Sequence, residues 1–268
     1  MKTIYYTDEL NDDFAATNGI KTQALPPDYK WIHTGFLWNF FADILYYLIV
    51  FPLVKIFNTI VVGLHVKNRG VIRRLKSGCF LYSNHTMHID PLLSADVSGW
   101  GHRTYFMAGN DAFSIKGLYH LVAMLGAMPL GYDMASMKEM LNTVSKRYHQ
   151  DSCITIYPEA HIWPYYTKVR PFMAGSFRFA VKSQKPCFSA TTTYRERKIL
   201  FYKCKRPGIT IYLDGPFYPD AALSQKKAEQ QLRDEVYFSM IKNSNQYVQK
   251  EYIEYVKDES SDYVVNDA

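Results

Sequence analysis

The chain has few cysteines and no arrangement that would use them to hold a fold together. Its four cysteines are far apart and form no C-x-x-C pair, so we expect no structural zinc site, and a reducing compartment suits them best. The first 34 residues carry five acidic and three basic side chains and no apolar core, which is not the pattern of a signal peptide. We find no internal repeat, and no linker divides the domain.

Positive charge is present in modest excess and is unevenly distributed. The formal net charge is +6, and the segment 65–76 contains five Lys or Arg and no acidic residue. A second segment, 195–206, has six basic residues and one acidic residue. Anionic lipid, nucleic acid and phosphorylated metabolites would all suit such clusters, so charge alone does not identify the partner.

The longest hydrophobic run extends from Gly35 to Val66 and is almost free of charge. Its ionisable residues are Asp43, Lys55 and His65. The run is long enough to span a bilayer, but Pro52 divides it into pieces of roughly 16 and 12 residues, each short for a crossing. Because the run is rich in aromatics and a basic cluster follows it, we expect a membrane-associated helical hairpin lying in one leaflet. A single span and a soluble core hairpin are the alternatives.

From Gly78 onward, short apolar runs alternate with segments of helical periodicity. This alternation predicts an α/β fold with a mixed, largely parallel sheet flanked by helices, preceded by the hairpin. The expected organisation is a polar lead-in, a hydrophobic segment, a main domain and an acidic tail, at residues 1–34, 35–66, 67–250 and 251–268.

The stretch YSNHTMHIDPLL, residues 82–93, places titratable groups directly after a predicted strand. In an α/β sheet, ligands gather beyond the carboxyl ends of the strands. His85 and Asp90 are five positions apart across a turn, where a carboxylate can orient an imidazole that acts as general base. An ordinary helix N-cap at Asp90 is the alternative. No Ser or Cys nucleophile accompanies the pair, which favours deprotonation of a substrate hydroxyl.

A second strand end, in ITIYPEAH, places Glu159 and His161 at the same edge of the predicted sheet. The segment after it contains Lys168, Arg170 and a glycine turn leading into a helix. Such cations can bind the oxygens of a phosphate, although each is also an ordinary surface charge.

These blocks together resemble the glycerolipid acyltransferases, the family of lysophosphatidic acid (1-acylglycerol-3-phosphate) acyltransferase. NHTMHID resembles the N-H-x-x-x-x-D motif of that family, YPEA stands where the family has F-P-E-G, and RPFMAGSFRFA resembles its P-F-x-x-G-x-F-x-x-A continuation. KPCFSA and GITIYLDGPF resemble the later strands, so the resemblance covers residues 65–218.

The resemblance implies acyl transfer from a thioester, acyl-CoA or acyl carrier protein, to the hydroxyl of a lysophospholipid in phospholipid biosynthesis. His85 would be the general base and Asp90 would orient it. Asn84 and Glu159 match positions that shape the acceptor site, and Gly175 matches the turn before a helix. No metal and no cofactor beyond the donor is implied. The partners are membrane lipid and the donor, not nucleic acid, and the location is the cytoplasmic face of the cell membrane.

Two family arginines that bind phosphate are absent. The family block G-x-x-F-I-D-R appears here as GAMPLGYD, and in the P-E-G-T-R block Ala160, His161 and Ile162 replace Gly, Thr and Arg. Lys168 and Arg170 are the candidate substitutes. Otherwise the acceptor is a different hydroxyl or an amine.

Two further readings remain open from the residues. One is a metal hydrolase that uses His85, His88 and a third ligand such as His161. The other is a non-catalytic membrane scaffold.

Overall fold

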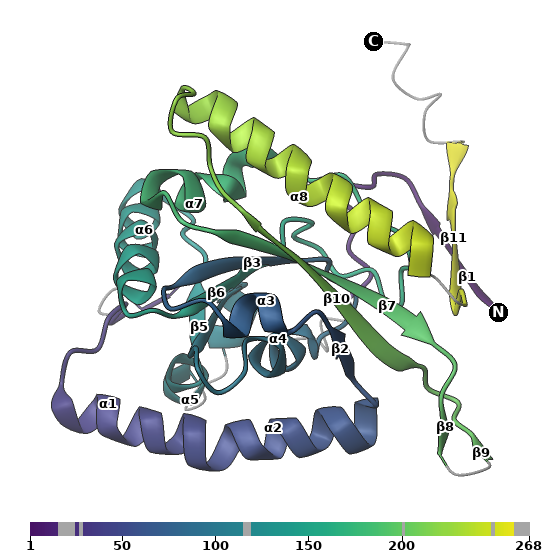
Figure 1. The fold of residues 1–268 in the computed structure, drawn as a ribbon, viewed down its shortest axis with the longest axis horizontal. Coiled ribbons are helices and arrows are strands. Elements are labelled where there is room, and N and C mark those ends of the chain that lie inside the picture. The colour runs from purple at the N-terminus through teal and green to yellow at the C-terminus, as the bar shows by residue number, and fades with distance from the viewer. Residues whose placement is uncertain (16–24, 27–28, 115–118, 200–201, 248–249, 260–268) are drawn as a thin grey trace.

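The computed structural model describes residues 1–15, 25–26, 29–114, 119–199, 202–247 and 250–259. Its centre is a seven-stranded sheet (Figure 1). In spatial order the strands are β2 (His65–Lys67), β10 (Gly208–Phe217), β7 (Cys187–Arg195), β3 (Cys79–Ser83), β6 (Cys153–Ile156), β4 (Thr104–Ala108) and β5 (Ala127–Pro129). The five strands from β7 to β5 are mutually parallel, whereas β10 runs antiparallel to β7 and parallel to β2. The predicted mixed, largely parallel sheet is confirmed.

Helices cover both faces of this sheet. They are α3 (Gly70–Arg73), α4 (Asp90–Ser98), α5 (Tyr119–Met124), α6 (Met134–His149), α7 (Arg178–Ser183) and α8 (Gln225–Tyr247). On β3, Phe80 and Tyr82 belong to the core formed with α6, α7 and α8, whereas Cys79 and Leu81 belong to the core that contains side chains of α4. Because β3 is buried on both faces, its sequence is a continuous apolar run rather than an alternating one.

The hydrophobic run forms one continuous helix, Phe36–Val62, which we call the apolar helix. It comprises α1 (Phe36–Asp43), a π-helical stretch (Ile44–Val50), α2 (Phe51–Phe57) and a final π-helical turn (Asn58–Val62). The predicted helical hairpin is therefore wrong. Pro52 lies in the first turn of α2, directly after the π-helical stretch, where the Phe51 N–H bonds to the Tyr46 carbonyl. The wider π-helical turn accommodates Pro52, so the helix continues past this residue.

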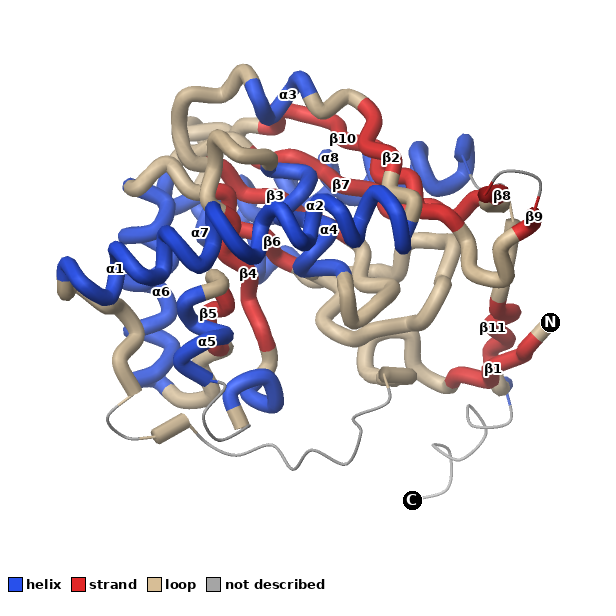
Figure 2. Tube along the Cα trace, turned by 90° about the horizontal axis from the view of Figure 1, so that it is seen from below, coloured by secondary structure: helices blue, strands red, loops and turns tan. Residues whose placement is uncertain are grey.

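One side of the apolar helix is fixed to the domain by polar contacts. The Tyr46 hydroxyl accepts a hydrogen bond from the backbone N–H of Thr104 at 3.1 Å. The amide of Asn58 donates to the Leu92 carbonyl at 3.0 Å, and Lys55 pairs with the buried carboxylate of Asp96 at 2.6 Å. These contacts, made on the side of α4 and β4, hold the helix along the domain (Figure 2).

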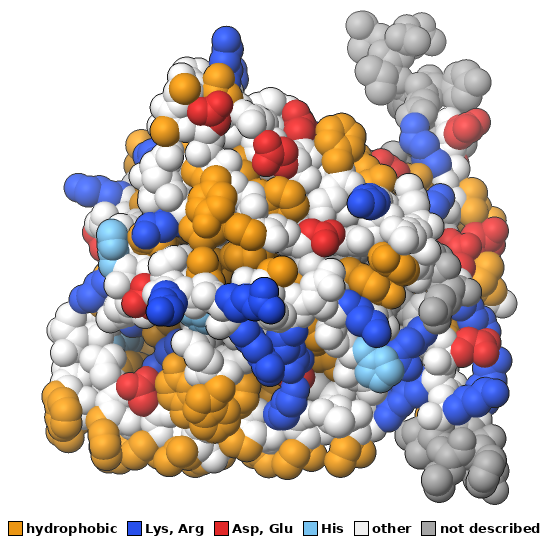
Figure 3. Space-filling model, viewed as in Figure 1, with side chains coloured by type: hydrophobic (Ala, Val, Ile, Leu, Met, Phe, Trp, Pro, Cys, Tyr) orange, Lys and Arg blue, Asp and Glu red, His pale blue; other side chains and the backbone are white. Residues whose placement is uncertain are grey.

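The opposite side of the apolar helix exposes large hydrophobic side chains. They form a row along its length, which Figure 3 shows at the lower edge of the molecule. The row includes Phe36, Leu37, Phe41, Leu48, Leu53, Ile56 and Ile60. This helix is long and apolar enough to cross a membrane, although its inner side is packed on the domain.

The two ends of the described chain pair with each other. β1 (Lys2–Tyr6) runs parallel to β11 (Ile253–Lys257), within segments that we expected to be a polar lead-in and an acidic tail. The pair is packed on the loop that follows β6, where Trp163 stacks on Tyr255 with ring centroids 4.9 Å apart. The far end of the expected tail, residues 260–268, lies outside the described residues.

Candidate active site

The sequence-predicted groups meet at the carboxyl ends of two neighbouring parallel strands. His85 follows β3, Glu159 follows β6, and Asp90 begins α4. The backbone N–H of His85 donates to Glu159 Oε2 at 3.1 Å, which joins the two strand ends directly. The edge of the sheet that sequence analysis selected is therefore a single cluster of polar side chains.

The imidazole of His85 is held by Asp90. The distance from His85 Nδ1 to Asp90 Oδ2 is 2.9 Å, and the same oxygen accepts the backbone N–H groups of Thr86 at 2.8 Å and Met87 at 2.9 Å. A buried carboxylate that accepts these bonds assigns the ring proton to Nδ1, which leaves the lone pair of Nε2 free. His85 Nε2 has no hydrogen-bond partner among the described residues, and the His85 side chain is 15% exposed. The imidazole can thus accept a proton from a bound molecule.

The ring of His85 also stacks on Tyr157, a contact that sequence analysis did not predict. The ring centroids are 4.3 Å apart and the planes are inclined by 19°. The Tyr157 hydroxyl lies 3.0 Å from Ser94 Oγ on α4, and burial raises the pKa of Tyr157 well above its usual range. The phenol is therefore neutral, and its ring forms a flat surface against which the imidazole packs. The only signal for it in the sequence is an aromatic residue directly before Pro158 and Glu159.

Glu159 and Arg170 form a buried pair behind the imidazole. Glu159 Oε1 accepts the backbone N–H of Arg170 at 2.9 Å, and Oε2 lies 3.5 Å from the guanidinium. Burial raises the pKa of Glu159, although Arg170 and the backbone donors act in the opposite direction. Arg170 is 1% exposed, donates to the carbonyls of Glu9 and His161, and lies over the ring of Trp163 at 4.8 Å. A direct contact between Arg170 and an acceptor would require this loop to move.

The side chain of Asn84 is also engaged in hydrogen bonds within the protein. Its amide donates to the Thr192 carbonyl at 3.2 Å and its side-chain oxygen accepts the Thr192 N–H at 2.8 Å. The buried Asn84 thus links the end of β3 to β7. Its side chain positions the loop that carries His85, and in this arrangement it does not line a substrate surface.

Lys168 and Gly175 are exposed, as expected for residues that meet a ligand from solvent. Gly175 lies in the short 3₁₀ helix Ala174–Phe177 that leads into α7, and a Cβ at this position would meet no atom within 4 Å. This open space leaves room for a ligand beside the backbone.

The histidines predicted as possible metal ligands do not form a cluster in the described part of the chain. His88 is exposed, and His161 Nδ1 lies 3.5 Å from Asp13 Oδ2. Within the described residues, no group of three or more His, Cys, Asp or Glu side chains is placed to hold a metal ion. This part of the chain therefore offers no set of metal ligands for a metal hydrolase.

The raised pKa of Glu159 predicts a specific pH dependence. A group whose pKa is raised on folding stabilises the fold while it is protonated, and this contribution is lost as the pH rises through the folded-state pKa. We therefore expect the unfolding free energy of the wild type, minus that of Glu159→Gln, to fall as the pH rises above the ordinary value of 4.5 and then to level off. Denaturant unfolding of both proteins across a pH series measures this difference, and a difference that stays constant or increases with pH contradicts the assignment.

Comparison with known proteins gives one family match and a structural likeness. The sequence model of the Acyltransferase family matches residues 63–193. The crystal structure of the 1-acyl-sn-glycerophosphate (LPA) acyltransferase PlsC from Thermotoga maritima has a similar fold, with a TM-score of 0.54 and 14% identity over 80% of this chain and 96% of that chain. No curated protein matches the chain. Residues 63–193 thus match the Acyltransferase family model, the chain has a PlsC-like fold, and the resemblance predicted from the sequence agrees with both findings.

Proposed function

We propose that this protein transfers a fatty acyl group from a thioester, acyl-CoA or acyl carrier protein, to the hydroxyl of a lysophospholipid. The observation that carries the proposal is the His85–Asp90 pair, with an oriented imidazole whose Nε2 is free among the described residues. The family match and the likeness to PlsC favour 1-acylglycerol-3-phosphate as acceptor.

The proposed mechanism uses His85 as general base and then as general acid. The acceptor oxygen attacks the thioester carbonyl carbon while His85 Nε2 takes the hydroxyl proton. Asp90 remains ionised and stabilises the imidazolium through Nδ1. When the tetrahedral intermediate collapses, the carbon–sulfur bond breaks and the imidazolium returns the proton to the leaving thiolate. The products are the new ester and the free thiol, and His85 ends in its starting state.

An apolar cavity beside α4 suits the fatty chain. It has a volume of about 140 Å³ and lies between the apolar helix, α4, β4 and α5, with a lining that is almost entirely hydrophobic. Pro91 and Leu92, which follow Asp90 directly in the sequence, form part of its wall, so the same first turn of α4 carries Asp90 and borders the cavity. We therefore assign this cavity to the acyl chain.

Filling the cavity should change the chain-length preference. Ala95 on α4 lines it, and Ala95→Phe places a ring in the space for the chain. Each buried methylene is worth about 0.8 kcal/mol, so excluding three lowers kcat/KM for long-chain donors roughly 10- to 100-fold and leaves short-chain donors little affected. A donor series of increasing length measures this preference. The control is Leu121→Phe, at an exposed position of α5 outside the cavity lining. A uniform loss at all chain lengths would contradict the assignment.

The identity of the acceptor head group depends on the cations that can reach it. The two family arginines are absent and Arg170 is buried against Glu159, so Lys168 is the exposed cation of the predicted set. A comparison of kcat/KM for 1-acylglycerol-3-phosphate, a zwitterionic lysolipid and a neutral monoacylglycerol tests this point. Preference for the phosphomonoester supports lysophosphatidic acid, whereas preference for the others assigns the enzyme to a different hydroxyl acceptor.

We also propose that the protein lies on the cytoplasmic face of the cell membrane, with the apolar helix parallel to the surface. The exposed row of hydrophobic side chains supports this orientation, since the inner side of the same helix is packed on the domain. Lys67, Arg73, Arg74 and Lys76 are exposed beyond the end of the helix, where anionic head groups would attract them. The four cysteines are free and far apart in the sequence, which suits a reducing compartment such as the cytoplasm.

A further inference from the structure

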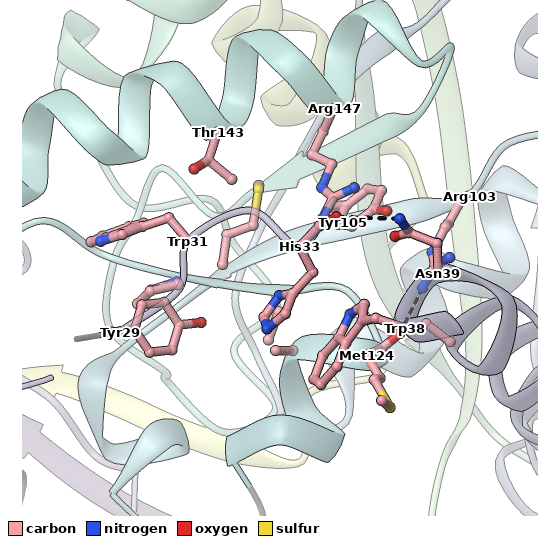
Figure 4. A pocket seen from close by; sticks show the side chains of 15 residues that line it. Tyr29, Trp31, His33, Trp38, Asn39, Arg103, Tyr105, Met124, Thr143 and Arg147 are labelled. Carbon is pink, nitrogen blue, oxygen red and sulfur yellow. Dashed lines mark hydrogen bonds between the residues drawn. The ribbon is translucent and has the colours of Figure 1, made fainter. Parts of the chain in front are cut away.

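A second cavity lies at the other end of the parallel strands, between α1, α6 and the loop before the apolar helix (Figure 4). Arg103 precedes β4 and Arg147 lies in the last turn of α6, so both are near the amino ends of strands whose carboxyl ends face the active site. Figure 4 shows Tyr105 between these two arginines. Their guanidiniums lie 5.4 and 4.6 Å from the centre of its ring. The cavity is therefore distinct from the cluster around His85.

The lining of this cavity is positively charged. The fifteen residues that line it include two arginines and a histidine and no Asp or Glu. Arg103 pairs with Asp43 on α1, whereas Arg147 has no carboxylate partner in the described part of the chain and donates only to Gln150 Oε1 at 3.1 Å. The Nε atoms of both arginines are buried and have no hydrogen-bond partner among the described residues. No carboxylate among the described residues offsets the charge of Arg147, so an anionic ligand here would be stabilised by it.

His33 also lies in positively charged surroundings. Its ring stacks on Trp38, with centroids 3.7 Å apart and planes inclined by 7°. Burial lowers the pKa of His33, and the nearby charges of Lys30, His120 and Arg147 lower it further. The groups that surround the imidazole are thus mainly basic, and an anion entering the cavity would offset them.

We propose that this cavity binds a phosphate group, supplied by the head group of an anionic membrane phospholipid. The interior has a volume of about 20 Å³, so a single phosphate oxygen would enter between the side chains, and the rest of the phosphate would stay outside this space. Charge-assisted bonds from arginine suit phosphate oxygens. Three lining residues, Trp38, Asn39 and Ala42, belong to α1, whose other side exposes Phe36, Leu37 and Phe41. A lipid whose chains lie along those side chains would have its head group beside the cavity.

The phosphate chemistry depends only on the cavity and is independent of acyl transfer. The lipid source rests on the proposed membrane association of the apolar helix. A free anion such as inorganic phosphate has the same chemistry, and the experiment must separate the two sources.

The test is a binding titration of the full-length protein in detergent, followed by tryptophan fluorescence, because Trp31 and Trp38 line the cavity. The probes are dioctanoyl phosphatidylglycerol, dioctanoylglycerol and inorganic phosphate. Phosphatidylglycerol is neither the proposed acceptor nor its product, and Arg147 lies outside the active site and the acyl cavity, so a loss of binding in the Arg147 variant reports on this cavity. The variants are Arg147→Met, which removes the unpaired guanidinium and keeps an apolar stem, and His33→Gln. The control is Arg74→Gln, which removes one exposed charge outside the cavity.

We expect phosphatidylglycerol to bind at least about tenfold more tightly than dioctanoylglycerol or inorganic phosphate, and Arg147→Met to weaken it about 10- to 150-fold. Arg74→Gln should bind like the wild type. Equal binding of dioctanoylglycerol, or unchanged binding by Arg147→Met, overturns the proposal. Inorganic phosphate binding as tightly as the lipid retains the phosphate site and overturns the lipid source. Thermal denaturation checks that the variants are folded, and if Arg147→Met is not, His33→Gln and the wild-type preference decide the question.

Discussion

Replacement of His85 by alanine is expected to lower the rate of acyl transfer about 100- to 10,000-fold, the range that positioned general bases contribute. The expectation follows from the single acceptor nitrogen, Nε2, that the bond between Nδ1 and Asp90 leaves free. Without it, the acceptor hydroxyl has no base to take its proton. The fold should survive, because the His85 N–H bond to Glu159 is made by the backbone and remains in the variant. The measurement is kcat for a labelled acyl thioester, with thermal denaturation to verify folding.

The matched control is His88→Ala. His88 lies in the same motif but is exposed, so its loss should leave kcat within about twofold of the wild type. Asp90→Asn should also lower kcat by orders of magnitude, because the imidazole loses the carboxylate that fixes its tautomer. A His85→Ala protein that keeps more than about a tenth of the wild-type rate would exclude general-base catalysis by this residue.

The second large effect is expected for membrane binding. Leu53 and Ile60 are 60% and 63% exposed on the outer side of the apolar helix. If this side lies among lipid chains, replacing both with aspartate removes two buried aliphatic side chains, each worth about 1.5–3 kcal/mol. The partition coefficient onto anionic vesicles should then fall at least about 100-fold. Sedimentation with vesicles measures the bound fraction.

The control for this effect is Phe238→Asp on α8. Phe238 is 64% exposed, and α8 lies on the opposite side of the molecule from the apolar helix (Figure 1). The same type of substitution there should leave vesicle binding unchanged. If the Leu53→Asp, Ile60→Asp protein sediments with vesicles as the wild type does, the apolar helix is not the membrane contact.

The parts of this structure that sequence analysis predicted depend on local pattern. The apolar strand that ends at Ser83 and the polar turn after it place His85 at a sheet edge, because parallel strands end together. The spacing from His85 to Asp90 indicates that the two side chains can meet across a turn, and in the structure the turn and the first residue of α4 bring them to 2.9 Å. Glu159 follows from the same rule applied to β6.

The parts that it did not predict depend on contacts between distant segments. The sequence marks Pro52 as a helix break, but a π-helical turn accommodates it, and the helix on either side of it is bonded to Thr104 and Leu92 of the domain. Arginine is a residue type that binds anions, and only the fold shows that the guanidinium of Arg170 faces Glu159 and the backbone carbonyl of Glu9. The pairing of β1 with β11 joins the two ends of the described chain, and no local periodicity indicates such a partner.

The central claim is that this protein makes an ester by transferring an acyl group. It is tested most directly by incubating the purified wild-type protein with isotope-labelled acyl-CoA and 1-acylglycerol-3-phosphate and detecting the products by mass spectrometry. The account predicts a labelled diacyl product and free thiol in equal amounts, formed by the wild type and at least about 100-fold more slowly by His85→Ala. If neither acyl-CoA nor acyl carrier protein yields a labelled ester with that acceptor or any lysolipid or monoacylglycerol, the acyltransferase account is contradicted and a non-catalytic scaffold remains.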